Sequence, residues 1–147
     1  MGMKKDCIYL PKFQGVLTLS KNGEILRQEH NLVTNIGKDF VLNSMVEGTA
    51  DSLNYWSIGD GTTPPSEDDI DLENEATGGR TAATTRVVSE RVLTITGQAA
   101  GGIYNQIWAE FGFFYGSTGS KLFSRIVFDP YTKVSGEVID WSYKIAL

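Results

Sequence analysis

The sequence predicts a mainly β protein, an antiparallel β-sandwich for which a jelly-roll topology is one expectation. Short runs of aromatic and β-branched residues recur along the chain, and strands favour both residue types. Most of the 16 glycines fall between these runs, where turns are expected. At 147 residues, a single domain covering 1–147 is expected. A partly closed barrel is the alternative architecture.

The stretch from Glu137 to Leu147 carries the clearest strand pattern in the sequence. Apolar residues occupy every second position against a mostly polar opposite set, which is the period of a strand with one buried face. The apolar set is Ile139, Trp141, Tyr143, Ile145 and Leu147. We expect this strand to be the third member of a meander formed by 105–115, 121–128 and 137–147, with Trp141 as a core anchor.

The first expected unit is a β-hairpin over 13–31, after a short apolar patch at Cys7–Leu10. Its turn is predicted at Asn22-Gly23, the strongest short hairpin signal.

One helix is predicted around 35–47. Thr34 or Asn35 is suited to cap it, and Asp39 is expected in the first turn, where the helix dipole favours a carboxylate. Gly48 is expected to end it, and Gly37 to weaken it.

A strand at 53–58 is predicted to lead into a long surface excursion at 59–85. Two prolines, Pro64 and Pro65, exclude ladder pairing near its start, and the segment 66–75 is strongly acidic. A loop of this length in a compact domain is usually functional or mobile.

The second half of the chain is expected to return to strands at 86–96, 104–115 and 121–128. A flexible link is expected at 97–102, and Asp129-Pro130 is expected to close the third of these strands. In all, about seven short strands and one helix are predicted, in keeping with a sandwich.

Charge and composition argue against several classes of function. The net charge is −5, and no basic cluster is evident beyond Lys4-Lys5, so nucleic-acid binding is not expected. The single cysteine, Cys7, cannot form an internal disulfide, which fits synthesis in a reducing compartment. No apolar run is long enough for a membrane span or a signal sequence, so we expect a soluble protein that is not secreted by the signal-sequence route.

The sequence offers no convincing catalytic or metal-binding set. His30 is the only histidine, and an exposed imidazole at a strand end is its simplest interpretation. The acidic run, with Asp60, could supply oxygen ligands to calcium, but EF-hand spacing is absent and a solvated loop is the better interpretation. We expect no enzymatic activity, cofactor or metal.

The aromatic residues of 104–115 have two interpretations. Tyr104, Asn105, Gln106 and Trp108 could form a sugar-binding row, although such residues are more often core in a sandwich. Their positions make both faces of one strand apolar. Such a strand is either central in its sheet or covered by a neighbouring subunit, which favours an oligomer.

The order of motifs resembles that of small structural proteins of tailed bacteriophages. The segments that carry the resemblance are 30–40, 58–65, 71–75 with Arg80, 109–114, 119–125, Thr132-Lys133 and 139–143. They include His30-Asn31-Leu32-Val33-Thr34-Asn35, Gly59-Asp60-Gly61-Thr62-Thr63-Pro64-Pro65 and Ile139-Asp140-Trp141-Ser142-Tyr143. These motifs are structural and contain no catalytic chemistry.

The resemblance implies a non-enzymatic virion protein made in the cytoplasm of a bacterial host, first a capsid decoration (cement) protein that stabilises the head shell. A tail fibre, baseplate or tail-adaptor component is the alternative, and a carbohydrate-binding module is a further one. The implied partners are other virion proteins, either the major capsid protein or tail proteins, and further copies of the chain, with a trimer favoured. The candidate structural and interface residues are Trp56, Asp60, Pro64, Pro65, Trp108, Phe111, Phe113, Phe114 and Trp141.

Overall fold

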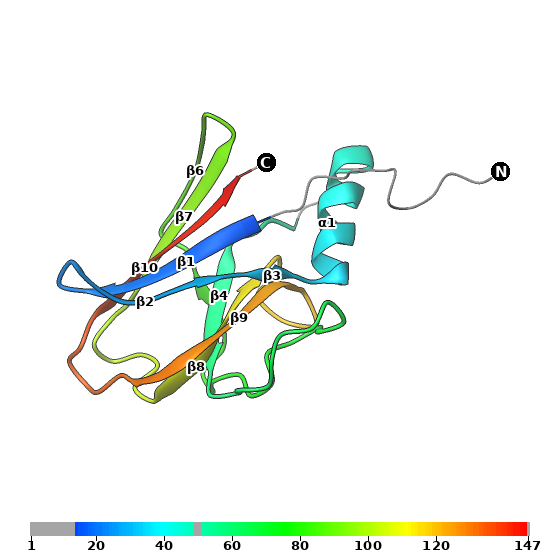
Figure 1. Ribbon diagram of the computed structural model, residues 1–147. Helices are drawn as coiled ribbons and strands as arrows, with labels where there is room; N and C mark the ends of the chain where they lie inside the picture. Colours follow the sequence, from blue (N-terminus) through cyan, green and yellow to red (C-terminus); the bar gives the residue numbers. More distant parts are fainter. Residues whose placement is uncertain (1–13, 49–50, 147) are drawn as a thin grey trace.

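The computed structural model describes residues 14–48 and 51–146, which form two five-stranded antiparallel sheets and one helix (Figure 1). The sheets pack face to face, and the predicted β-sandwich is confirmed. The patch Cys7–Leu10, the first hairpin residue Phe13 and the last residue Leu147 lie outside the described residues.

The two sheets interleave strands from the two halves of the chain. The first sheet contains, in spatial order, β2 (Glu24–His30), β1 (Gln14–Lys21), β10 (Ile139–Ala146), β7 (Val92–Ala99) and β6 (Thr85–Ser89). The second sheet contains β3 (Leu32–Val33), β9 (Leu122–Thr132), β8 (Ile107–Phe114), β4 (Tyr55–Gly59) and β5 (Thr81–Ala82).

The first hairpin and the helix form where the sequence predicts them. Asn22 and Gly23 have φ angles of 51° and 80°, as a two-residue type I′ turn between β1 and β2 requires. Helix α1 (Asn35–Val46) begins at Thr34, whose hydroxyl oxygen accepts a 3.0 Å hydrogen bond from the Gly37 N–H. It ends before Gly48, at a φ of 68°. Asp39 lies beyond the first turn, so its expected interaction with the helix dipole there is wrong.

The predictions for 86–96 and 97–102 differ from the structure. The strand expected over 86–96 is a hairpin, β6 and β7, because Glu90 and Arg91 adopt φ angles of 51° and 67° and reverse the chain. No glycine or asparagine marks this turn in the sequence. The link expected at 97–102 begins later, since β7 continues through Ala99.

Strand β9 also passes through Asp129-Pro130, where the sequence predicts its end. The register between β8 and β9 shifts between Trp108 and Glu110, opposite this proline. A bulge leaves backbone groups outside the regular ladder, so a residue without an N–H is tolerated there.

The closing strand β10 is not the third member of a meander. It crosses to the first sheet and pairs there with β1 and β7, while β8 and β9 pair in the second sheet. Its burial alternates strictly, as its period-two pattern predicts. The apolar face of β10 still meets the aromatic residues of β8, but it does so across the sandwich.

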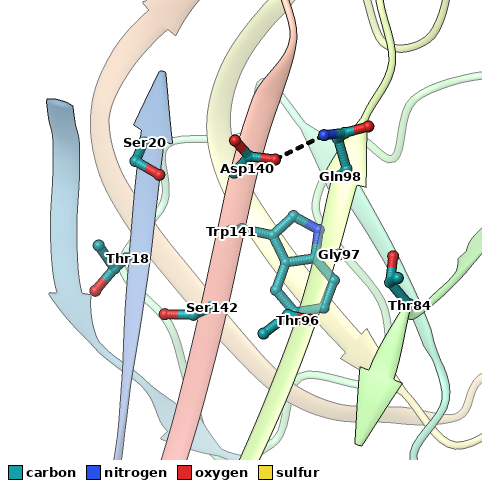
Figure 2. A pocket seen from close by; sticks show the side chains of 9 residues that line it. All are labelled: Thr18, Ser20, Thr84, Thr96, Gly97, Gln98, Asp140, Trp141 and Ser142. Atoms are coloured by element: carbon teal, nitrogen blue, oxygen red, sulfur yellow. Dashed lines mark hydrogen bonds between the residues drawn. The ribbon is translucent and has the colours of Figure 1, made fainter. Parts of the chain in front are cut away.

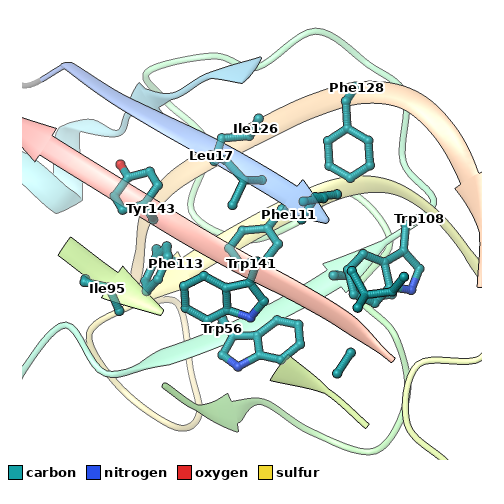
Figure 3. Packing of buried hydrophobic residues seen from close by; sticks show 14 of the residues in the cluster. Leu17, Trp56, Ile95, Trp108, Phe111, Phe113, Ile126, Phe128, Trp141 and Tyr143 are labelled. Carbon is teal, nitrogen blue, oxygen red and sulfur yellow. The ribbon is translucent and has the colours of Figure 1, made fainter. Parts of the chain in front are cut away.

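The core between the sheets is centred on Trp141 (Figure 3). Its ring centroid lies 5.3 Å from those of Trp56 and Phe111 and 5.2 Å from that of Phe113. Gly97 is its partner on β7, where a Cβ would lie 2.3 Å from the indole. Trp141 is 2% exposed, so its predicted role as a core anchor is confirmed.

Candidate functional site

The outer face of the second sheet is covered by the chain itself. In the 59–85 excursion, Leu72 packs on Phe114 and Leu122 and forms a second, smaller hydrophobic cluster with them. Phe114 is fully buried there, while Phe111 and Phe113 point into the main core. Strand β8 is thus central in its sheet and buried on both faces by its own chain, and its two apolar faces give no support for an oligomer.

A buried carboxylate at Glu110 holds the excursion on this face. It accepts hydrogen bonds from the backbone N–H groups of Gly61 at 3.3 Å, Glu73 at 3.0 Å and Asn74 at 2.8 Å. The guanidinium of Arg125 on β9 donates to it at 2.7 Å. An ionised carboxylate accepts only, and the converging donors here are what its burial requires.

The same arginine neutralises two acidic residues of the excursion. Arg125 lies 3.2 Å from Asp69 and 3.4 Å from Glu73, and its side chain is 2% exposed. The Thr63 hydroxyl and N–H, together with the Arg125 charge, hold the pKa of Glu73 below its usual value. A single β9 side chain therefore joins β8 to two points within the acidic segment 66–75, Asp69 and Glu73.

Arg80 holds the C-terminal part of the excursion in a similar way. We call these two sets of contacts, one around Glu110 and Arg125 and one around Arg80, the latches of the loop. The Arg80 guanidinium pairs with Asp71 at 3.2 Å and Glu75 at 3.3 Å and donates to the Gly116 carbonyl at 3.1 Å. It also lies 3.6 Å from the centre of the Phe114 ring, in cation–π geometry.

The two arginines correct the prediction of a merely solvated acidic loop. Four of its carboxylates pair with Arg80 or Arg125: Asp69, Asp71, Glu73 and Glu75. Groups of acidic, cysteine or histidine residues that could hold a metal ion are absent from the described residues. The ion pairs and hydrogen bonds of this site attach the loop to the sheet.

A third buried charge, Lys133, fixes the loops at one end of the sandwich. Its ammonium donates to the Ala100 carbonyl at 2.9 Å and to Asn105 Oδ1 at 2.6 Å, and the residue is 1% exposed. Burial lowers its pKa. Together with the Gly136 N–H, which donates to Gly101 at 3.0 Å, it ties residues 133–136 to residues 100–105.

The outer face of the first sheet carries a shallow polar depression of about 410 Å³ (Figure 2). Hydroxyl side chains line it, four from β1, β7 and β10 and one from the residue before β6: Thr18, Ser20, Thr96, Ser142 and Thr84. Gln98 donates a 2.8 Å hydrogen bond to Asp140 across its rim. This face offers small hydroxyls, one amide and one carboxylate, which suits polar contact with a flat surface.

The predicted site residues fall into two places. All six aromatic residues are buried, Phe114 in the second cluster and the others in the main core: Trp56, Trp108, Phe111, Phe113, Phe114 and Trp141. The interpretation of the aromatic residues of 104–115 named here and of Trp141 as core residues is therefore confirmed. Trp56, predicted only as a structural or interface residue, also lies in the core. Asp60 and Pro64 are exposed, Pro65 is half-buried, and Asp60 accepts a hydrogen bond from the Asn74 amide.

Sequence reasoning missed the residues that organise the site: Arg80, Glu110, Arg125 and Lys133. A signal for two of them was present, because Glu110 and Arg125 stand alone as charges inside apolar strands. A charged residue in such a run has to be paired if it is buried. Their opposite signs on adjacent predicted strands were the clue.

Comparisons with known proteins give no relative for this chain. No family model matches it, and no curated protein or solved structure matches it either. Among the described residues, the one helix is 12 residues long, too short to cross a membrane. The fold and site define a β-sandwich whose longest loop is latched by buried charges.

Proposed function

We propose that this protein is a non-enzymatic structural component of a tailed-bacteriophage virion, and that it decorates the head shell. Its partners are then the major capsid protein and further copies of the chain. The observation that carries the proposal is the convergence in space of motifs that are far apart in the sequence and resemble those of phage structural proteins.

Four of those motifs meet at one carboxylate. Gly61 of the 58–65 motif, Glu73 of the 71–75 motif and Arg125 of the 119–125 motif all hydrogen-bond to Glu110 of the 109–114 motif. These hydrogen bonds hold the excursion on the sheet, so the segments that carry the resemblance are ones that build this architecture. This supports membership of a class of structural proteins.

The charge arrangement also suits a passive, durable module. The buried charged residues of the described chain, Glu110, Arg125 and Lys133, all engage internal partners. Latching a long loop with ion pairs that bridge two strands and a hydrophobic cluster restricts its motion. A shell protein that must remain attached to a particle benefits from such rigidity.

A tail fibre, baseplate or tail-adaptor role is the second candidate, because the resemblance is to virion structural proteins as a class and does not distinguish head proteins from tail proteins. The carbohydrate-binding alternative depended on a row that includes Trp108. That side chain is fully buried and its indole N–H donates to the Tyr104 carbonyl at 2.9 Å. Its ring face is not available for stacking on a sugar.

The deciding experiment images particles of the encoding phage made with and without this protein. The proposal expects surface protrusions to disappear from expanded heads and to return when purified protein is added back. Gold-labelled antibody should mark heads. Heads that keep all protrusions and tails that carry the label would replace the proposal with the tail role.

Two matched variants allow the binding of added protein to the heads to be compared quantitatively. Glu29 is an exposed residue of β2, so Glu29→Gln is expected to bind as the original protein does. Glu110→Gln weakens the latch and is expected to reduce occupancy at temperatures where the loop opens. Loss of binding by Glu29→Gln alone would place the contact on β2.

A further inference from the structure

Each sheet of the sandwich ends in two edge strands, and an unprotected edge is a template for pairing with another chain. Three of the four edges are blunted. Strands β3 and β5 are only two residues long. The pairing of β2 with β1 is interrupted by a bulge opposite Leu19 and Ser20 of β1. The β2 residue Arg27 also donates hydrogen bonds to the Asp129 and Pro130 carbonyls of the other sheet.

Strand β6 is longer than β3 and β5 and has no register shift against β7, and Arg86 donates one hydrogen bond from it, to the Ser52 hydroxyl at 3.2 Å. All five of its residues are exposed, and its register with β7 runs unbroken from Thr85 to Ser89. Val87 and Val88 are 56% and 74% exposed, although β-branched residues favour a paired strand. The β6–β7 hairpin forms one end of the first sheet and reaches beyond the rest of the sandwich (Figure 1).

We propose that β6 is an interface between copies of this chain, in which it pairs antiparallel with β6 of a second copy across a two-fold axis. The two first sheets then join into one continuous sheet. This inference goes beyond the proposed function and does not depend on it, because association between copies can be tested on the purified protein without any virion.

The turn of the hairpin determines which backbone groups are free for this pairing. Glu90 and Arg91 both have positive φ, so they form a two-residue turn and Ser89 exchanges hydrogen bonds with Val92. By alternation, Val87 and Thr85 also direct their backbone groups toward β7. The N–H and C=O groups of Arg86 and Val88 face away from the sheet.

One two-fold register uses all of these outward groups. Pairing Arg86 of one copy with Val88 of the other makes two hydrogen bonds, and the symmetry operation repeats them. Val87 then lies opposite Val87 on the axis, as a closely spaced apolar pair. Every β6 residue has a partner in this register.

Charge complementarity favours a second copy as the occupant. In this register the turn of each copy lies beside the start of β6 in the other. Arg86 is then one diagonal step from Glu90 of the second copy, within reach of long side chains. Its guanidinium donates to the exposed Ser52 hydroxyl through one nitrogen, which leaves its other N–H groups for this carboxylate. The symmetry makes this contact twice.

Sedimentation of the full chain over a wide concentration range tests the interface. The proposal expects a reversible monomer–dimer equilibrium. Val87→Lys places two positive charges opposite each other on the axis and should leave a monomer at every concentration. Val134→Lys, at another exposed valine, should leave the equilibrium unchanged. A monomer or a closed trimer for the original chain would overturn the proposal.

Disulfide trapping tests the register. In a Cys7→Ser background, Val87→Cys should give a covalent dimer on mild oxidation, because directly opposed residues lie within disulfide range. Val88→Cys should crosslink at least tenfold more slowly, since its counterpart lies one diagonal step away. Equal crosslinking of both, or of Val88→Cys alone, would rule out this pairing. Circular dichroism of each variant checks that the fold is kept.

Discussion

The Glu110 carboxylate and the Arg125 guanidinium lie 2.7 Å apart on adjacent strands, with side chains that are 0% and 2% exposed. This pair stands on the outer face of the second sheet, beneath the 59–85 excursion. The carboxylate also accepts three backbone N–H groups from the excursion. One ion pair therefore fixes both the strand register and the position of the loop.

Replacing Glu110 with Gln should strongly destabilise the protein. The variant keeps the side-chain size but leaves the buried Arg125 without its closest carboxylate and turns amide hydrogens toward backbone donors. Breaking a buried ion pair by removing one partner costs about 3–5 kcal/mol. Urea unfolding followed by tryptophan fluorescence measures the loss.

The matched control for this variant is Glu29→Gln on the exposed strand β2, which should change the free energy of unfolding by less than about 0.5 kcal/mol. Limited proteolysis within 66–75 should be faster for Glu110→Gln than for the control. If Glu110→Gln unfolds at the same urea concentration as the original protein, the latch contributes nothing to stability.

Replacing Gly37 with Ala should destabilise the protein even though alanine favours a helix. Alanine is better than glycine inside a helix by about 1 kcal/mol. Here, however, a Cβ at position 37 would lie 2.4 Å from the Phe123 carbonyl oxygen and 2.9 Å from the Phe123 Cα. Backbone atoms cannot move away as a flexible side chain can, so α1 must shift off β9.

We expect a net loss of about 1–3 kcal/mol for Gly37→Ala, as for other overpacked sites. Gly102→Ala is the control, because a Cβ there meets no atom within 4 Å. Thermal unfolding monitored by circular dichroism compares the two. A more stable Gly37→Ala protein would mean that α1 does not pack closely on β9.

Local patterns in the sequence predicted the elements whose signal is local. The Asn22-Gly23 turn, the Thr34 cap and the alternation of β10 are all confirmed, because each depends on neighbouring residues alone. The assignment of β10 to a sheet depends on distant strands, and the meander prediction was wrong. The Glu90-Arg91 turn was missed because both residues adopt a backbone conformation that their types rarely take.

The candidate site was less predictable for a related reason. The acidic run and the excursion were visible in the sequence, but nothing in the local sequence around Arg80 or Arg125 pairs either arginine with the acidic run. Only the sheet brings Glu110 beside Arg125, which lies 15 residues further along the chain. The burial of the aromatic residues was predictable, since large apolar side chains in a sandwich strand are usually core.

Replacing Trp141 with Ala should remove about 3–5 kcal/mol of stability, as other buried tryptophans do. Gly97→Ala should also destabilise the protein, by about 1–3 kcal/mol, because its Cβ would lie 2.3 Å from the indole. In the Trp141→Ala background the added methyl group enters the vacated space. The cost of Gly97→Ala should then fall close to zero.

A double-mutant cycle measured by urea unfolding tests this coupling. Contacting residues commonly show interaction energies of about 0.5–3 kcal/mol. The sum of the two single losses should therefore exceed the loss in the double variant. Strict additivity would indicate that Gly97 and Trp141 are not in contact, and an unchanged stability of Trp141→Ala would remove this residue from the core.

The interaction of Lys21 with Glu137 should make stability depend on acidity in a defined interval. The 2.6 Å hydrogen bond from Lys21, with further bonds from the Val134 N–H and the Tyr131 hydroxyl, lowers the pKa of Glu137 from 4.5 to about 2. The folded state thus favours the ionised carboxylate, so the contribution of this interaction to the free energy of unfolding is complete above pH 4.5 and is lost as the pH falls toward 2.

Urea unfolding at a series of pH values tests this dependence. Glu137→Gln should be less stable than the original protein at neutral pH, and the difference in stability should shrink as the pH falls from 4.5 toward 2. Glu29→Gln is the control, and a difference for Glu137→Gln that stays constant down to pH 2 would contradict the assignment.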